Sequence, residues 1–305
     1  MAHCFVEAAE QILDKEFPVL DKGFVRLVDY LGSDERVVQA ARVSYGAGTK
    51  TYREDAALID YLLRNEHTSP FEQVVLTFHI KLPIFVARQM VRHRTARLNE
   101  ISGRYSVMKD DFYVPALEDI ALQSTDNKQG RMAEPVDPDT GRFIQEQLEA
   151  GQRQAYQQYQ NLLEQGLARE LARINLPLSL YTEWYWQMDL HNLFHFLKLR
   201  LDPHAQKEIR AYAQVMFDIA RTVAPRCCES FERHILGGVR FSREEFVELQ
   251  RRLGITPQGK PETKHSALQN AKSPEANGAS TAETGRLTGK NLERFEEKLR
   301  TGRQT

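Results

Sequence analysis

The fold is decided by the stretch 74–82, which reads VVLTFHIKL and is followed at once by Pro83. Apolar and polar side chains alternate along it with a period of two, the pattern of a strand that buries one face. The buried face would carry Val74, Leu76, Phe78, Ile80 and Leu82. Because proline is favoured in the first turn of a helix, the sequence predicts a helix over 84–94 directly after this strand.

The segment that follows, 92–105, reads RHRTARLNEISGRY and contains four arginines. We expect the end of the helix to run here into an irregular loop. The planar guanidinium of arginine grips phosphates and carbonyl groups through several N–H donors. The backbone at Ser102 and Gly103 can approach an oxyanion closely, because glycine has no side chain. The segment therefore indicates a site for a phosphate-bearing ligand, and an interfacial cluster of salt bridges is the alternative.

The same segment resembles the signature of the flavin-dependent thymidylate synthases in its Arg-His-Arg, Asn-Glu, Ser and Arg-Tyr blocks. One position departs from that signature, since the family usually has serine where this chain has Arg97. The similarity extends from about Asp21 to about Gly237 and includes the segment 40–44. It implies an enzyme that methylates dUMP to dTMP. The carbon donor would be methylenetetrahydrofolate, and the hydride donor would be reduced FAD, which NADPH regenerates.

The resemblance also implies the fold and the assembly. We expect an α/β (α+β) fold, in which a small, mostly antiparallel sheet is packed by several helices, and a homotetramer with active sites shared between subunits. The loop 92–104 and the region of Arg173 and Arg200 would then come from different subunits. The predicted domains are an N-terminal leader at 1–21, the synthase domain at 22–253 and a low-complexity, disordered tail at 254–305.

Further elements are predicted from the periodicity of apolar residues. Strands are expected over 23–31, 111–114 and 179–188, and helices over 34–44, 52–65, 143–165, 190–201, 203–224, 226–236 and 242–253.

Carried onto this sequence, the resemblance assigns a set of residues to dUMP: Gln89, Met90, Val91, Arg92, Glu100, Ile101, Ser102, Gly103, Arg104, Arg173 and Arg200. Arg200 is the predicted catalytic residue. Uracil C5 becomes a good nucleophile when the ring loses its N3 proton, and a permanent positive charge favours that anion. No cysteine stands near the arginine-rich segment, so activation by addition of a thiolate is not expected.

The residues assigned to FAD by the resemblance are Ser69, Arg92, His93, Arg94, Glu100, Asp189, Leu190, His191 and His195, with Ser44 and Glu72 as weaker candidates. A common family pattern has asparagine where this chain has Asp189 and His195. No Gly-x-Gly-x-x-Gly follows a predicted strand, so a Rossmann dinucleotide site is not expected.

Other features limit the alternatives. His191 and His195 have a spacing that could ligate a metal, with His204 downstream, but the glutamate of the zinc protease motif is missing, and we expect no metal. Lys plus Arg number 41 against 42 acidic residues, whereas a nucleic-acid binder should be basic. Two alternatives stay open: a non-catalytic nucleotide- or RNA-binding protein, and an inactive flavoprotein of the same family.

The remaining expectations concern the chain as a whole. The three cysteines, Cys4, Cys227 and Cys228, have neither the spacing of metal ligands nor that of a disulfide framework, so we interpret the adjacent pair as packing residues. With no signal-peptide pattern and no apolar stretch of about 18 residues, we expect a soluble, cytoplasmic protein.

Overall fold

The computed structural model describes residues 4–43, 52–125, 128–253 and 289–301. The chain divides into two compact units, residues 1–235 and 236–305, and each is described here by itself.

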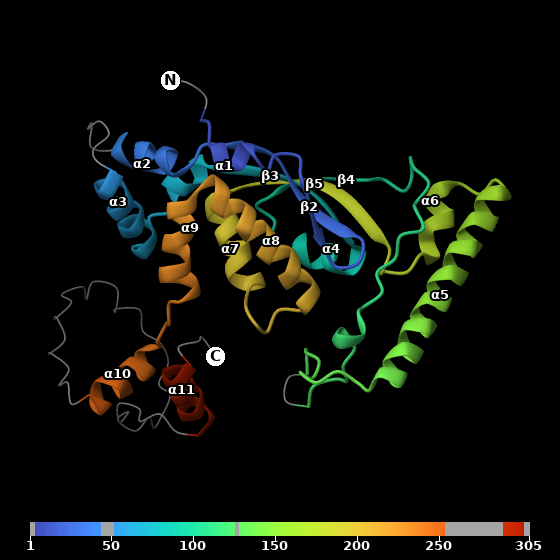
Figure 1. The fold of residues 1–305 in the computed structure, drawn as a ribbon. Helices are drawn as coiled ribbons and strands as arrows, with labels where there is room; N and C mark the ends of the chain where they lie inside the picture. The colour runs from blue at the N-terminus through green and yellow to red at the C-terminus, as the bar shows by residue number, and fades with distance from the viewer. Residues whose placement is uncertain (1–3, 44–51, 126–127, 254–288, 302–305) are drawn as a thin grey trace, which may run out of the picture. The chain divides into compact units, whose positions relative to one another are not determined.

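The first unit is built on a five-stranded sheet (Figure 1). In spatial order the strands are β1 (Glu16–Val19), β2 (Gly23–Leu31), β3 (Val75–Pro83), β5 (Tyr181–Asp189) and β4 (Arg97–Glu100). All neighbouring strands are antiparallel. The predicted α+β class and antiparallel sheet are therefore confirmed, and β1 places four residues of the predicted leader 1–21 in the sheet.

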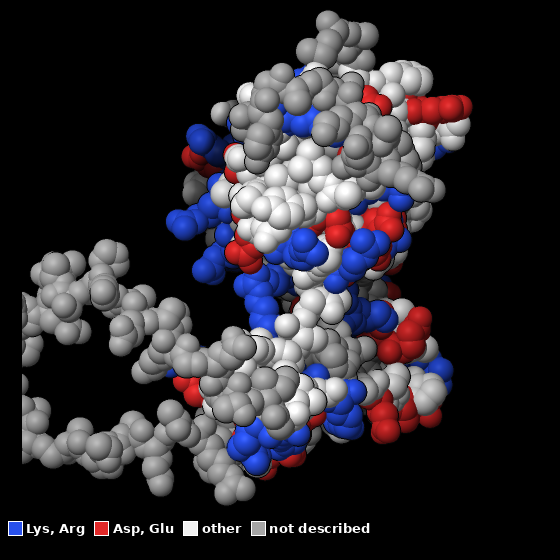
Figure 2. All heavy atoms as spheres, turned by 90° about the vertical axis from the view of Figure 1, so that its left-hand side faces the viewer, with Lys and Arg blue, Asp and Glu red and all other residues white. Residues whose placement is uncertain are grey.

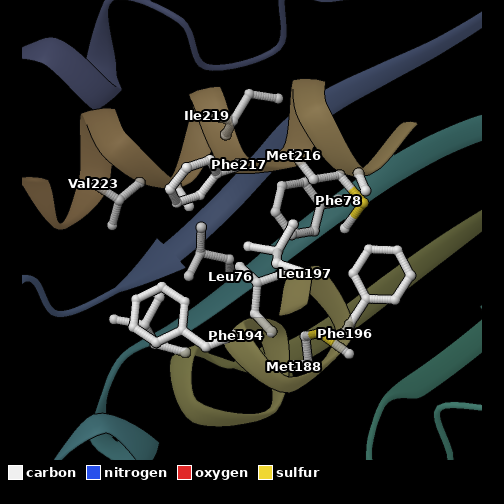
Figure 3. Close-up of a cluster of buried hydrophobic side chains, with 14 of the residues drawn as sticks. Leu76, Phe78, Met188, Phe194, Phe196, Leu197, Met216, Phe217, Ile219 and Val223 are labelled. Carbon is white, nitrogen blue, oxygen red and sulfur yellow. The ribbon is translucent and has the colours of Figure 1, made fainter. Parts of the chain in front are cut away.

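One face of the sheet carries the main core. The five predicted inward residues at 74–82 are fully buried, and they join side chains from α2 (Asp34–Arg42), α3 (Tyr52–Arg64), α7 (Leu190–Arg200), α8 (Lys207–Val223) and α9 (Pro225–Phe231). Figure 3 shows Leu76 and Phe78 of β3 meeting the side chains of α7 and α8. Phe194 of α7 stacks on Phe231 of α9 with ring centroids 4.3 Å apart, so the helical layer is locked together by aromatic contacts.

A smaller cluster packs around α5 (Pro138–Glu164) and α6 (Arg169–Ala172). Helix α5 begins five residues before the predicted start at 143, because Asp137 accepts hydrogen bonds from the backbone N–H groups of Asp139 and Thr140. The strand predicted over 111–114 is wrong. Only an isolated bridge between Phe112 and Leu180 forms in that part of the described chain.

The helix after β3 is shorter than predicted. Helix α4 spans Ile84–Met90 rather than 84–94. The N–H of His93 donates to the carbonyl of Met90 at 3.0 Å, so the backbone closes a tight turn there instead of continuing the helix. Similarly, α8 starts at Lys207 rather than 203, because the N–H of His204 bonds to Asp202 Oδ1 at 2.8 Å in a preceding turn.

Helix α9 is held at its N-terminus by a residue far away in the sequence. Asp34 accepts hydrogen bonds from the backbone N–H groups of Arg226 (2.8 Å) and Cys227 (2.9 Å). Cys227 and Cys228 are fully buried in the core, which confirms their interpretation as packing residues. Burial raises the pKa of both thiols, and Asp34 adds to the effect.

The second unit contains α10 (Arg243–Arg252) and α11 (Gly289–Thr301). Lys298 is buried and donates to both carboxylate oxygens of Glu245 at 2.7 and 2.8 Å, while Phe295 has no exposed surface. Helix α11 lies in the segment expected to be a disordered tail, and residues 254–288 of that segment lie outside the described residues. Among the described helices, none is long and apolar enough to cross a membrane.

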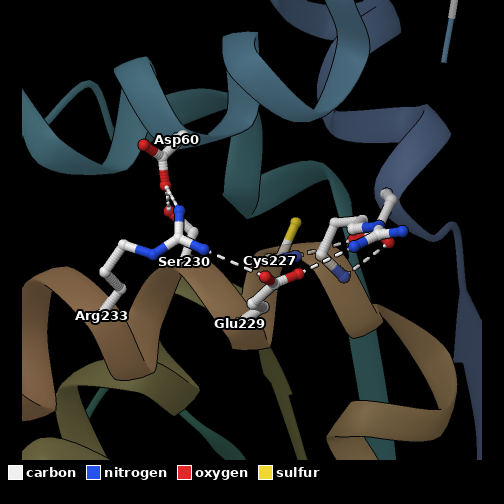
Figure 4. Close-up of polar contacts among 7 residues, drawn as sticks. Asp60, Cys227, Glu229, Ser230 and Arg233 are labelled. Carbon is white, nitrogen blue, oxygen red and sulfur yellow. Dashed lines mark hydrogen bonds and ion pairs between the residues drawn. The ribbon is translucent and has the colours of Figure 1, made fainter. Parts of the chain in front are cut away.

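Asp60 on α3 ties α3 to the end of the helical layer. Its Oδ1 accepts from Ser230 Oγ at 3.1 Å and from Arg233 Nη1 at 3.0 Å, and lies 2.8 Å from His234 Nε2 (Figure 4 shows Asp60 with Ser230 and Arg233). Burial pushes the pKa of Asp60 upward. The hydrogen bonds from His234 and Ser230, with the charges of His234 and Arg233, outweigh burial and set the pKa below its ordinary value.

We therefore expect Asp60→Asn to lower the free energy of unfolding at pH 7 by about 1–3 kcal/mol. Because the folded-state pKa is depressed, the stabilisation is present above the unfolded pKa and is lost as the pH falls through the folded pKa. Urea unfolding at pH 7 and at about pH 3.5 should show the difference between variant and wild type shrinking in acid. Glu146→Gln, an exposed position on α5, is the control, and an equal loss in both variants would contradict the prediction.

Candidate active site

The predicted site residues fall into two clusters within the first unit. The first lies where α4 and α7 end and contains Arg92, His93 and Arg200. The second lies after β4 and contains Gly103 and Arg173. Each of the two distant arginines contacts part of the loop 92–104 within one chain, and the expectation that different subunits contribute these parts to one site stays a prediction.

In the first cluster, a histidine faces inward beside an arginine. Arg200 Nε donates to His93 Nε2 at 3.1 Å. The His93 ring packs edge-on against Phe196, with centroids 4.9 Å apart and planes at 84°, and Phe196 packs in the same way on Trp186 at 5.1 Å. Only 9% of His93 is exposed, so the tight turn after α4 brings a polar ring into an aromatic pocket.

Burial and the neighbouring charges determine the protonation states of His93 and Arg200. Burial lowers the pKa of His93 to about 4, and the nearby positive groups Arg200 and His195 act in the same direction. His93 is therefore neutral at pH 7, and its Nε2 can accept a hydrogen bond from the N–H of Arg200 Nε. Burial also lowers the pKa of Arg200, with a contribution from the charge of Arg92, but an arginine remains protonated at neutral pH.

The start of α7 holds further residues assigned to FAD. Asp189 caps the helix, since its two oxygens accept from the N–H and the side-chain amide of Asn192 at 2.9 and 2.6 Å. Leu190 is fully buried, and its N–H donates to the carbonyl of Val74. Ser69 is exposed in a 3-10 turn, Ser69–Gln73, whose Phe71 ring lies 6.4 Å from that of Phe194 in α7. The turn thus stands beside α7.

Three other predicted residues have different environments. Met90 is fully buried, so its side chain belongs to the core, while Val91 is 44% exposed. Gln89 donates to Gln206 Oε1 at 2.6 Å, which ties α4 to the turn before α8. Ser44 lies outside the described residues, and Glu72 is exposed.

In the second cluster, the expected irregular loop begins with the short strand β4, which pairs with β5. Glu100 Oε1 then accepts from Thr182 Oγ1 at 2.6 Å, and the Ile101 N–H donates to the Glu183 carbonyl at 2.9 Å. These two hydrogen bonds hold the chain against β5 directly before the turn at 102–104.

The glycine of this turn leaves room for two neighbouring side chains. A Cβ on Gly103 would lie 2.9 Å from Met108 Sδ and 3.0 Å from Arg173 Cδ, so the Arg173 side chain rests directly on this glycine. Arg104 Nε donates to Glu170 Oε2 at 3.1 Å, while Ser102 Oγ accepts the N–H of Arg104 at 3.3 Å.

Several cationic side chains of the two clusters lack a protein partner. The guanidinium groups of Arg92, Arg94 and Arg173, all exposed residues, form no hydrogen bond or ion pair with any residue that the structure describes. Such guanidinium groups can bind phosphates. The N–H donors of these three arginines therefore fit both a nucleotide and a flavin dinucleotide. In the described ranges, no three His, Cys, Asp or Glu side chains are grouped so that they could hold a metal ion.

Comparison with known proteins identifies the class. Residues 26–226 match the family described as Thymidylate synthase complementing protein, and residues 239–305 match the Thymidylate synthase ThyX C-terminal domain. The solved structure of a UMP/dUMP methylase PolB from Streptomyces cacaoi, bound with 5-Br dUMP, aligns with a TM-score of 0.66 at 33% identity, covering 72% of this chain and 98% of that one.

The relatives narrow the class to one family. The flavin-dependent thymidylate synthase of Treponema denticola is 62% identical over 292 residues, which is 96% of this chain and 100% of the relative. That of Treponema pallidum is 57% identical over 304 residues, covering 100% of this chain and 91% of the relative. This chain belongs to the flavin-dependent thymidylate synthase family. The predicted family, and with it a flavin-dependent methyltransferase of nucleotide biosynthesis, is confirmed.

Proposed function

We propose that this chain methylates dUMP to dTMP, with methylenetetrahydrofolate as the carbon donor, reduced FAD as the hydride donor and NADPH as the reductant of the flavin. In this reaction the N3 proton of uracil is lost and C5 attacks the methylene carbon. The C5 proton is then lost as tetrahydrofolate leaves, and addition of a hydride to the bridging carbon with return of a proton to N3 gives the methyl group of dTMP. The observation that carries the proposal is the bond of the half-buried Arg200 to the buried His93, beside an Arg92 side chain that has no partner among the described residues.

The roles of the protein follow from the charges in this cluster. A guanidinium that is permanently positive and half-buried favours the N3 anion of uracil more than water does, because the surrounding medium screens the charge less. The FAD supplies the hydride when bound. The protein holds the nucleotide and the flavin, and it keeps the guanidinium of Arg200 in place.

We assign dUMP to the two clusters together, through Gln89, Arg92, Glu100, Ile101, Ser102, Gly103, Arg104, Arg173 and Arg200, and through the backbone of Met90 and Val91. We assign FAD to Ser69, Arg92, His93, Arg94, Glu100, His191, His195 and the backbone at Asp189 and Leu190. The unpaired guanidinium groups support these assignments, since each would otherwise have no anionic partner.

We also propose that the chain assembles into a homotetramer. Large apolar side chains beside the second cluster are exposed: Tyr105 (76%), Ile174 (68%), Leu178 (55%), Leu171 (50%) and Ile101 (40%). Exposed apolar side chains grouped in this way indicate a protein interface. Strand β4, which directly precedes Ile101, lies at the edge of the sheet and can pair there with another strand. Light scattering on the purified chain measures the oligomeric state, and a monomer would contradict the proposal.

The test of the reaction is release of tritium from C5-tritiated dUMP. Release should require methylenetetrahydrofolate and NADPH together, and dTMP should form in equal amount. Figure 2 shows both basic and acidic side chains among the described residues of one face, whereas a nucleic-acid binder is expected to be basic. A protein that holds flavin without releasing tritium would be an inactive member of the family. A protein that binds dUMP but neither holds flavin nor turns over would be a binding protein.

A further inference from the structure

We propose that His93 is a positioning residue for the reaction, which fixes the guanidinium of Arg200 through the Nε hydrogen bond. This inference rests on the proposed role of Arg200 at the uracil ring. It gives His93 a task apart from any contact with flavin, because the task is carried out by the ring nitrogen that faces Arg200.

The bond is made at the one guanidinium nitrogen that controls the orientation of the plane. Nε joins the planar group to the flexible part of the side chain, so a partner at Nε restricts the last rotations of the chain. The two terminal NH2 groups are left for a ligand. A guanidinium tethered in this way can present both groups to a carbonyl and an ionised N3 without losing rotational freedom on binding.

His93 is itself held from several sides. Its ring contacts Phe196 edge-on, lies 6.0 Å from the ring of His195, and is buried. Its backbone N–H is bonded to the Met90 carbonyl. The partner of Arg200 is thus supported by rigid elements, which is what holding a reactive group to a fraction of an ångström requires.

The bond exists only while His93 is neutral. A protonated ring would turn Nε2 into a donor facing the donor on Arg200. The positive and titratable groups around the pair are Arg200 and His195, both on α7, and Arg92 on the adjoining turn. Burial, then Arg200 and His195, oppose protonation of His93 and lower its pKa to about 4, while Arg92 acts on Arg200, so the acceptor persists across the physiological range.

The test compares His93→Phe, which keeps a ring against Phe196 but removes the acceptor, with His93→Gln, whose amide oxygen can reach the place of Nε2. With flavin content matched, we expect His93→Phe to lower kcat about 10- to 100-fold, with a smaller change in the affinity for dUMP. The loss should shrink as the pH rises from 7 to 9, because uracil N3 then ionises with less help. His93→Gln should recover most of the rate. His204→Gln, at an exposed histidine, is the control.

A double-mutant cycle separates this inference from the proposed function. If His93 acts through Arg200, then adding His93→Phe to Arg200→Lys should cause little further loss, whereas a merely structural role gives multiplied losses. Full activity of His93→Phe alongside an inactive Arg200→Ala would overturn the role of His93 alone. Full activity of Arg200→Ala would overturn the role of Arg200 first. If His93→Phe fails to fold or to hold flavin, His93→Asn takes its place, since its amide is too short to reach, and equal rates for Asn and Gln would overturn the inference.

Discussion

Arg200→Ala should lower the rate of tritium release from dUMP by about 10²–10³-fold, the typical cost of removing one group that stabilises charge developing in a transition state. The residue lies at the last position of α7, half-buried, with Arg92 near enough to lower its pKa. A positive charge is therefore present where solvent screens it weakly. Without it, the ring must lose its N3 proton without a compensating charge.

The measurement is single-turnover tritium release on protein whose flavin content has been matched by absorbance. Arg200→Lys is the informative companion, because it keeps the charge and loses the planar fork, so its rate should fall between those of wild type and Arg200→Ala. Arg153→Ala removes an exposed arginine that pairs with Glu149 on α5 and serves as the control. A loss below tenfold for Arg200→Ala would remove this residue from the chemistry.

Gly23→Ala should be among the most destabilising single-methyl changes in this chain. A Cβ at Gly23 would lie 2.0 Å from Tyr212 Oη, 2.7 Å from the Lys81 carbonyl and 2.8 Å from the Val19 carbonyl. The two carbonyls belong to strands on either side and cannot withdraw without breaking the sheet. The Tyr212 hydroxyl is itself bonded to the Lys81 carbonyl at 2.8 Å. We expect a loss of about 3 kcal/mol in the free energy of unfolding, the upper part of the range for overpacking.

A second glycine provides the matched control. A Cβ at Gly151, inside α5, meets nothing within 4 Å, and alanine in a helix is favoured over glycine by about 0.5–1 kcal/mol. Urea unfolding followed by circular dichroism should therefore move in opposite directions for Gly23→Ala and Gly151→Ala. A Gly23→Ala protein as stable as the wild type would mean that the strands can separate to accept the methyl group.

The sheet could be predicted wherever one face of a strand is buried, since burial imposes alternation on the residues. This is why 74–82 shows its strand plainly and β4 does not: all four residues of β4 are exposed, so no pattern marks them. The early start of α5 was encoded in the pair Asp137 and Pro138, a capping residue followed by proline. The polar composition of the residues around this pair obscures the signal.

The site was predicted as a set of residues, but its internal arrangement was not. Arg200 and His93 are 107 residues apart in the sequence, and their bond depends on where α4 ends and on how α7 crosses the sheet. Local patterns contain neither fact. The resemblance supplied the names of the residues, whereas the separation of the segment 92–104 into a part beside Arg200 and a part beside Arg173 required the folded chain.

Because Asp34 caps α9, the two cysteines of this helix can be used to follow its detachment from the core by thiol labelling. Thiol reagents attack the thiolate, and the buried thiols of Cys227 and Cys228 have raised pKa values, so they stay silent while α9 is docked. Cys4 is partly accessible, so we expect it to be labelled first. The rate at which Cys227 and Cys228 become labelled therefore measures how often α9 detaches from the core in the native protein, without denaturant.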